Sequence, residues 1–141
     1  GAGRRRRRRR NAFGLIQEYC TIMKFYISSR VKKANQVKDF ADKLKSLGHK
    51  ITLDWTAFES LKPYNKNQKQ SAKVSNQMLK AIKNCDVFIL LTDRAGTGMY
   101  VEFGYALAHG KKVFIMGKHI NKSIFFFHPK VRIINSIEDI I

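Results

Sequence analysis

The chain has 141 residues, a length that fits one domain with a substantial core and excludes two. Hydrophobic residues make up 44% of it, and no apolar run approaches the roughly 18 residues that a membrane-spanning helix needs. The formal net charge of +18 leaves both nucleic acid and phosphorylated small molecules open as partners, although the lysines are spread over every predicted helix, as on a solvated basic surface.

The first 22 residues differ in composition from the rest of the chain. They contain seven consecutive arginines, Arg4–Arg10, and a following stretch with no clear period. Met23 stands directly before the first strand-like run, as a native start would. We therefore interpret residues 1–22 as a tag, cloning-derived or disordered basic extension that binds nucleic acid only non-specifically, and residues 23–141 as the folded domain.

Two cysteines, Cys20 and Cys85, have neither a metal-ligand spacing nor the pattern of a disulfide framework. This usage is typical of a reducing compartment, and we expect a cytoplasmic protein. The four histidines show no paired ligand spacing, so we predict no metal site and no tightly held cofactor.

Strand-like and helical patterns alternate from residue 24 onward, with apolar spacings of 3 and 4 in the helices and short β-rich or wholly apolar runs between them. The predicted elements are, in chain order, a strand at Lys24–Ser28, a helix from Val31 to Leu47, a strand at Ile51–Trp55, a loop at Thr56–Lys69, a helix at Ser71–Asn84, a strand at Asp86–Leu91, a turn at Thr92–Gly98, a helix at Met99–His109, a strand at Lys112–Met116, a candidate fifth strand at Val131–Ile134 and a short helix capped by Ser136.

This alternation favours an α/β fold, because parallel neighbouring strands need right-handed helical crossovers. We predict a flavodoxin-like three-layer sandwich with a parallel sheet of about five strands. In such sheets ligands bind outside the carboxyl ends of the strands, so functional residues should directly follow each strand. The loop Thr56–Lys69 is long enough to act as a lid over that end.

The most informative segment is Thr92–Gly110, in which a glycine-containing turn leads from a buried strand into a helix. Gly96 and Gly98 allow close backbone approach to a ligand, and we place Glu102 in the first turn of the helix. A carboxylate there either complements the helix dipole or attacks an anomeric carbon, as in retaining glycoside chemistry.

Three segments, KFYISSR, CDVFILL and GMYVEFGYALAHGKKV, resemble the nucleoside 2-deoxyribosyltransferase family and the related 2′-deoxynucleoside 5′-phosphate N-hydrolases. The resemblance covers most of residues 23–118 and is most specific in the E-x-G-x-A core of the last segment. It implies that Glu102 is the nucleophile, that Tyr26 orients it, and that Ser28, Ser29 and Arg30 hold a 5′-phosphate. On residue type alone, Tyr26 is equally typical of a strand aromatic packed in the core.

One position departs from the family pattern, since Met78 stands where the family has an acid that contacts the base or protonates the leaving group. Asp93 or Asp54 would substitute as general acid, with Asp93 preferred, although an aspartate after a strand also commonly caps a turn. The substrate-binding residues that we predict are Ser28, Ser29, Arg30, Asp54, Trp55, Gly96, Gly98 and Met99, beside the catalytic residues Glu102, Tyr26 and Asp93.

Three functions stay open at this point. The first is cleavage or transfer of the N-glycosidic bond of a nucleoside or nucleoside 5′-monophosphate, with hydrolase and transferase unresolved. The second is NAD glycohydrolysis, because the chain also resembles TIR-like domains, and the third is a non-catalytic nucleotide-sensing module. The family's active sites are completed by a neighbouring subunit, so we expect a homo-oligomer, with the aromatic cluster Phe125–Phe127 and the adjacent His128-Pro129 as a candidate interface.

Overall fold

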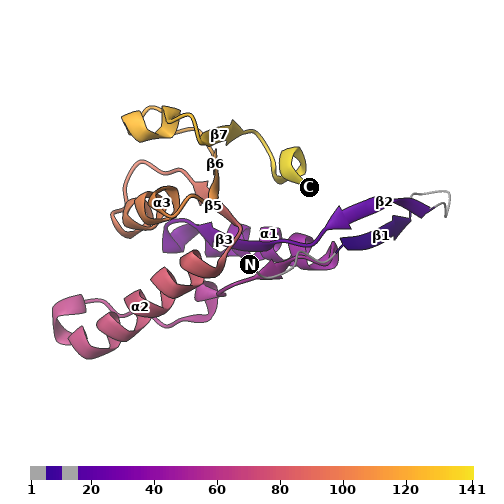
Figure 1. Ribbon diagram of the computed structural model, residues 1–141. Coiled ribbons are helices and arrows are strands. Elements are labelled where there is room, and N and C mark those ends of the chain that lie inside the picture. Colours follow the sequence, from indigo (N-terminus) through magenta and orange to yellow (C-terminus); the bar gives the residue numbers. More distant parts are fainter. Residues whose placement is uncertain (1–5, 11–15) are drawn as a thin grey trace.

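The computed structural model describes residues 6–10 and 16–141, which form two separate β-sheets (Figure 1). The larger sheet has five strands in the order β4-β3-β5-β6-β7, and each neighbouring pair is parallel. The predicted flavodoxin-like parallel sheet is therefore confirmed. Its strands are β3 at Lys24–Ser28, β4 at Lys50–Ile51, β5 at Val87–Leu91, β6 at Lys112–Met116 and β7 at Val131–Ile134.

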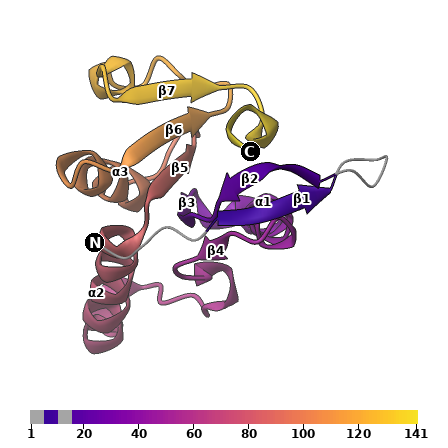
Figure 2. The same cartoon turned by 45° about the vertical axis from the view of Figure 1, so that its right-hand side comes forward.

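Among the described residues, three α-helices cover the two faces of the five-stranded sheet (Figures 1 and 2). Helix α1, Ala34–Ser46, lies against one face. Helices α2, Gln68–Asn84, and α3, Gly98–Ala108, lie against the other, which completes the predicted three-layer sandwich. Within the described part of the chain, no helix is both long and apolar enough to span a membrane.

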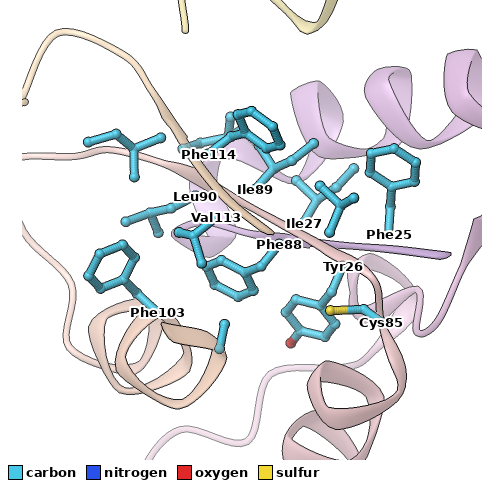
Figure 3. Packing of buried hydrophobic residues seen from close by; sticks show 14 of the residues in the cluster. Phe25, Tyr26, Ile27, Cys85, Phe88, Ile89, Leu90, Phe103, Val113 and Phe114 are labelled. Carbon is cyan, nitrogen blue, oxygen red and sulfur yellow. The ribbon is translucent and has the colours of Figure 1, made fainter. Parts of the chain in front are cut away.

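The buried side chains of the strands alternate between the two faces, because successive residues of a strand point in opposite directions. On β3, Phe25 and Ile27 point toward α1, whereas Tyr26 points toward α2 and α3 (Figure 3). Strand β5 is buried along its whole length, as a central strand covered on both faces should be. The same alternation directs the hydroxyl of Tyr26 to the α3 side of the sheet.

The second strand is shorter than the predicted Ile51–Trp55. Strand β4 covers only Lys50–Ile51, and the chain then turns into a short 3-10 helix, η2, at Trp55–Ala57. Trp55 is 8% exposed, and its indole Nε1 donates a hydrogen bond to the carbonyl of Ile27 at 2.7 Å. The β-rich composition of this run therefore reflects the burial of Trp55 against β3 rather than a long strand.

The remaining elements follow the predicted order with small shifts in their bounds. The stretch predicted as a loop contains a 3-10 helix, η3, at Tyr64–Lys66, and α2 begins at Gln68. The predicted helix after Ser136 is a 3-10 helix, η5, at Ile137–Ile140, and it begins with a capping box. The role of the loop as a lid stays a prediction.

Residues 6–10 and 16–21 form an antiparallel hairpin of strands β1, Arg6–Arg10, and β2, Ile16–Thr21. This hairpin is the second sheet, and it shares no strand pairing with the five-stranded one. The rest of the arginine-rich segment, residues 1–5 and 11–15, lies outside the described residues. Its interpretation as a tag or extension, and the domain boundary after residue 22, stay predictions.

The strand order creates a topological switch point between β3 and β5. After β3 the chain passes to α1 on one face of the sheet, and after β5 it passes to α3 on the other. Open parallel sheets bind their ligands outside the carboxyl ends of the strands at such points. We therefore expect the ligand-binding residues at the end of β3, directly after β5 and at the start of α3.

Candidate active site

The ends of β3 and β5 lie side by side, because Ser28 pairs with Leu90 in the parallel register. The residues that follow these two strands therefore meet at one edge of the sheet. Two carboxylates reach this edge: Asp93, which follows β5, and Glu102, which belongs to α3. Each has its own set of partners.

Glu102 accepts hydrogen bonds from two residues of β3. The hydroxyl of Tyr26 donates to Oε2, and the hydroxyl of Ser28 donates to Oε1 at 3.3 Å. Tyr26 is fully buried and stacks on Phe88 with ring centroids 5.8 Å apart, so its position is fixed by the core. Tyr26 is thus both a core aromatic and a partner of Glu102, which joins the two interpretations that its sequence position left open.

The pKa values of this pair are coupled. Burial raises the pKa of Glu102, and the hydrogen bonds from Tyr26 and Ser28 lower it only in part, so the pKa stays above its ordinary value. Burial and the neighbouring Glu102 carboxylate raise the pKa of Tyr26 far above the usual range of a tyrosine. The phenol therefore keeps its proton and acts as a hydrogen-bond donor to the carboxylate.

Glu102 does not stand in the first turn of its helix, and that prediction is wrong. Helix α3 begins at Gly98, one residue before the predicted start, and its first turn contains no acidic residue. Because the influence of a helix dipole falls off within the first turn, it is a minor influence on Glu102. The ionised form is stabilised mainly by the two hydroxyl donors of β3.

Asp93 is surrounded by donors and cations. Its Oδ1 accepts hydrogen bonds from the backbone amide of Arg94 at 2.6 Å and from Nη1 of Arg30 at 3.3 Å. Its Oδ2 lies 3.4 Å from Nζ of Lys32 and 3.5 Å from Nζ of Lys33. The side chain of Asp93 is 2% exposed, so these contacts hold a buried carboxylate.

This environment opposes the predicted role of Asp93 as a proton donor. Burial raises the pKa of its carboxyl, but the amides of Ala95 and Arg94, the Arg30 guanidinium and Lys33 outweigh that effect and lower the pKa far below its usual range. A carboxyl of this kind is ionised at neutral pH and has no proton to give. Its contacts favour a positioning role instead.

The β5–α3 turn brings Arg30 close to the backbone. Gly96 has a φ of 112°, which favours glycine, and a β-carbon at this position would lie 3.1 Å from Cγ of Arg30 and 3.3 Å from Cε of Met99. Met99 is buried, whereas Gly98 has open space where a β-carbon would stand. The side chain of Arg30 thus lies across Gly96 and reaches Asp93.

Three other predicted residues take no part in these contacts. Asp54 is exposed and caps η2 by accepting a hydrogen bond from the amide of Thr56 at 3.1 Å. Trp55 is buried with its indole bonded to β3, an environment that favours a structural role over stacking on a base. Ser29 donates to the carbonyl of Arg30 at 2.8 Å. Met78 packs partly buried against the core and supplies no acid.

Sequence reasoning missed two residues of the cluster, Lys32 and Lys33. Both contact Asp93, and Nζ of Lys33 also donates to the carbonyl of Thr92. The signal was available, because the two lysines follow Arg30 directly after β3, at the edge where ligands bind. The lysine-rich composition of the whole chain concealed it.

A five-stranded parallel sheet with the partly buried carboxylate of Glu102 at its switch point defines an α/β protein with an enzyme-like site. The model of the nucleoside 2-deoxyribosyltransferase family matches residues 26–131, a span that includes Tyr26, Asp93 and Glu102. The chain belongs to this family, whose enzymes act on N-glycosidic bonds. The predicted resemblance and enzyme class are confirmed.

Among solved structures, the chain is similar to a CMP N-glycosidase, BcmB, from Clostridium botulinum. The sequences are 23% identical, the TM-score is 0.58, and the match covers 80% of this chain and 88% of that one. At this identity the likeness supports the fold. A comparison with curated protein sequences found no match. The expected homo-oligomer and cytoplasmic location stay predictions.

Proposed function

We propose that the chain cleaves or transfers the N-glycosidic bond of a nucleoside 5′-monophosphate or nucleoside, with Glu102 as the nucleophile. The observation that carries this proposal is the contact of Tyr26 and Ser28 with the two oxygens of Glu102. A carboxylate held at both oxygens by fixed donors is oriented for attack on one carbon atom. Family membership supports the same chemistry.

The reaction has two steps. In the first, a carboxylate oxygen of Glu102 forms a bond to C1′ while the bond from C1′ to the base nitrogen breaks, and the base leaves with that electron pair and takes up a proton. In the second, water or another base attacks C1′ and gives up a proton to solvent, the ester bond breaks, and the carboxylate of Glu102 is restored. Water as acceptor gives hydrolysis, and a second base gives transfer.

The charges beside Glu102 favour a phosphorylated substrate. Arg30, Lys32 and Lys33 surround the single carboxylate of Asp93, so the cluster has an excess of positive charge. A phosphate monoester carries up to two negative charges at neutral pH and would compensate that excess. The name of the similar glycosidase includes CMP, a nucleoside monophosphate, and this also supports the preference.

In this proposal Asp93 is a positioning residue. It holds Arg30 across Gly96 and fixes the turn through the amides of Arg94 and Ala95. Asp93 therefore acts on the substrate through Arg30 rather than by proton transfer.

The test is chromatographic detection of free base from deoxynucleosides, ribonucleosides, their 5′-monophosphates and NAD, with and without a second base. We expect Glu102→Gln to lower kcat by at least about 10³-fold, as loss of a nucleophile does in other enzymes. The matched variant Asp93→Asn also replaces a carboxylate by an amide, and we expect it to keep kcat within about tenfold, because a positioning residue acts mainly on binding.

The outcomes separate the candidate functions. Exchange products mark a transferase, and a preference for monophosphates supports the role of Arg30. Release of nicotinamide from NAD alone would favour glycohydrolysis of NAD. If no substrate releases a base while nucleotides still bind, the enzyme proposal fails and a nucleotide-sensing module is left.

A further inference from the structure

A cavity lies apart from Glu102, between α3 and the 3-10 helix η4, Ile124–Phe127. Its volume is about 760 Å³, within the range of small-molecule sites. The α3 residues that line it follow the spacing of one helix face: Tyr100, Phe103, Gly104, Leu107 and Ala108. Glu102 is not among the lining residues, because its side chain is directed to β3.

The walls of this cavity include aromatic rings whose positions are fixed by packing. Tyr100 and Phe103 line the cavity, and both pack on Phe126, which is fully buried. The ring of Phe126 lies 6.1 Å from that of Tyr100 and 5.4 Å from that of Phe103. Phe125 of η4 also lines the cavity and is 57% exposed. The cavity thus offers aromatic surface for a planar ring.

The rim of the cavity is cationic. Arg94 lies at the β5–α3 turn, and Lys122 and Lys130 flank η4. His128 also lines the cavity, and its Nδ1 accepts a hydrogen bond from the amide of Lys130 at 3.0 Å, which leaves the proton of a neutral ring on Nε2. No aspartate or glutamate is among the lining residues. This combination of charges fits an anion.

Gly104 adds an independent observation. It lies inside α3, where glycine is less favourable than alanine, yet apart from its chain neighbours and the nearby backbone of α3 itself, no atom of the described residues lies within 4 Å of the position that its β-carbon would take. The packing within the chain therefore does not require glycine at this position. A side chain there would enter the cavity that Gly104 lines, so glycine keeps this space open.

We propose that this cavity is an accessory binding site for a nucleoside phosphate, with the base against Tyr100 and Phe125 and the phosphate at the cationic rim. Aromatic rings beside cations recognise this ligand class, because a base stacks on the rings and phosphate pairs with Lys and Arg. The site goes beyond the proposed reaction and does not require Glu102 to be a nucleophile.

The accessory site is connected to the Asp93 cluster. The hydroxyl of Tyr100 donates to the backbone carbonyl of Asp93 at 3.4 Å. The residues Arg94–Gly96 line the cavity, and a β-carbon at Gly96 would lie 3.1 Å from Cγ of Arg30, which is not among the lining residues. A ligand in the cavity would therefore act on the turn that positions Arg30.

The test measures binding of ADP by titration calorimetry, in a Glu102→Gln background to prevent turnover. We expect Lys122→Glu to weaken binding at this site by about tenfold, the effect of roughly 1.4 kcal/mol. The control Lys80→Glu makes the same change of charge on α2 and should have less than about a twofold effect. Gly104→Leu should fill the cavity and remove one bound ADP per chain, without lowering Tm.

Three results would overturn the proposal. The first is unchanged stoichiometry and affinity for ADP in both Gly104→Leu and Lys122→Glu. The second is inorganic phosphate binding as tightly as ADP, because the aromatic walls would then have no role. The third is a change of oligomeric mass in Gly104→Leu with ADP binding intact, which would assign the cavity to contact with a second copy of the chain.

Discussion

Glu102 and Asp93 are carboxylates at the same edge of the sheet, but their surroundings move their pKa values in opposite directions. Around Glu102, burial is the dominant influence, the hydroxyls of Tyr26 and Ser28 offset it in part, and the pKa is raised. Around Asp93, burial is outweighed by backbone amides and by Arg30 and Lys33, and the pKa is lowered. Groups whose surroundings separate their pKa values in this way commonly have different roles.

The two carboxylates also differ in how their negative charge is compensated. Asp93 lies within 3.5 Å of three cationic side chains. Glu102 accepts hydrogen bonds from two neutral hydroxyls, and it forms no salt bridge with any other described residue. In the proposed reaction, its negative charge is therefore available to stabilise the positive charge that develops on a sugar as an N-glycosidic bond breaks.

The largest effect that sharpens this comparison is expected from Tyr26→Phe. The variant removes a hydrogen bond to a charged group, which contributes roughly 1.5–3 kcal/mol, so kcat should fall roughly ten- to hundred-fold. This hydrogen bond lowers the pKa of Glu102, so its loss raises that pKa further. In the proposed reaction, activity requires the ionised form and falls below that pKa, so the acid limb of the pH–rate profile should move to higher pH.

The stacking of Tyr26 on Phe88 is retained in Tyr26→Phe, which makes the variant a test of the hydroxyl alone. An acid limb at the wild-type pH would contradict the view that Glu102 controls it.

A second prediction concerns stability, because the two carboxylates should affect its pH dependence with opposite signs. The pKa of Asp93 is lowered in the folded state, so its contribution is present above its ordinary value of 3.8 and is lost as the pH falls below that value. The pKa of Glu102 is raised, so its contribution is present below 4.5 and is lost as the pH rises through the folded-state pKa.

Thermal melts of wild type, Asp93→Asn and Glu102→Gln from pH 2 to pH 8 measure how the contribution of each carboxylate to stability changes with pH. Asp93→Asn should be less stable than wild type by a few degrees at neutral pH, with the gap closing in acid. Glu102→Gln should gain stability relative to wild type as the pH rises above 4.5. Parallel curves for all three proteins would refute the contrast between the two sites.

The sequence predicted most of the fold, because the wholly apolar β5 and the helical spacings around it are local signals. The end of the second strand was mispredicted, since Trp55 is a β-favouring residue by type but is held by a hydrogen bond to Ile27, which is distant in sequence. Composition does not reveal such a contact, and the long-range environment of a residue overrides its propensity.

The candidate site was predictable to a different degree in its two halves. The pair of Tyr26 and Glu102 was predicted from the family resemblance of two short segments, KFYISSR and GMYVEFGYALAHGKKV. The contacts of Lys32 and Lys33 with Asp93 did not, because they join residues about 60 positions apart and lysine is usually a solvated residue. The sequence does not reveal that these cations contact Asp93, and it therefore predicts a role in proton transfer for this carboxyl group.

The smallest effect is expected from Ser28→Ala, which tests whether the second donor acts in the same direction as the first. The hydroxyl of Ser28 lies 3.3 Å from Oε1 of Glu102, and it also lowers the pKa of that carboxyl. Because a bond of this length is weak, we expect kcat to fall only about two- to fivefold. The acid limb should move upward by less than in Tyr26→Phe.

Ser29→Ala is the matched control, because it removes the same hydroxyl from the neighbouring residue, where it donates to the carbonyl of Arg30 and not to Glu102. The acid limb should therefore stay at the wild-type pH in this variant. If Ser29→Ala and Ser28→Ala moved the limb equally, the shift would report a change in the whole β3–α1 connection. A shift confined to Ser28→Ala would instead assign the control of Glu102 to its two direct donors.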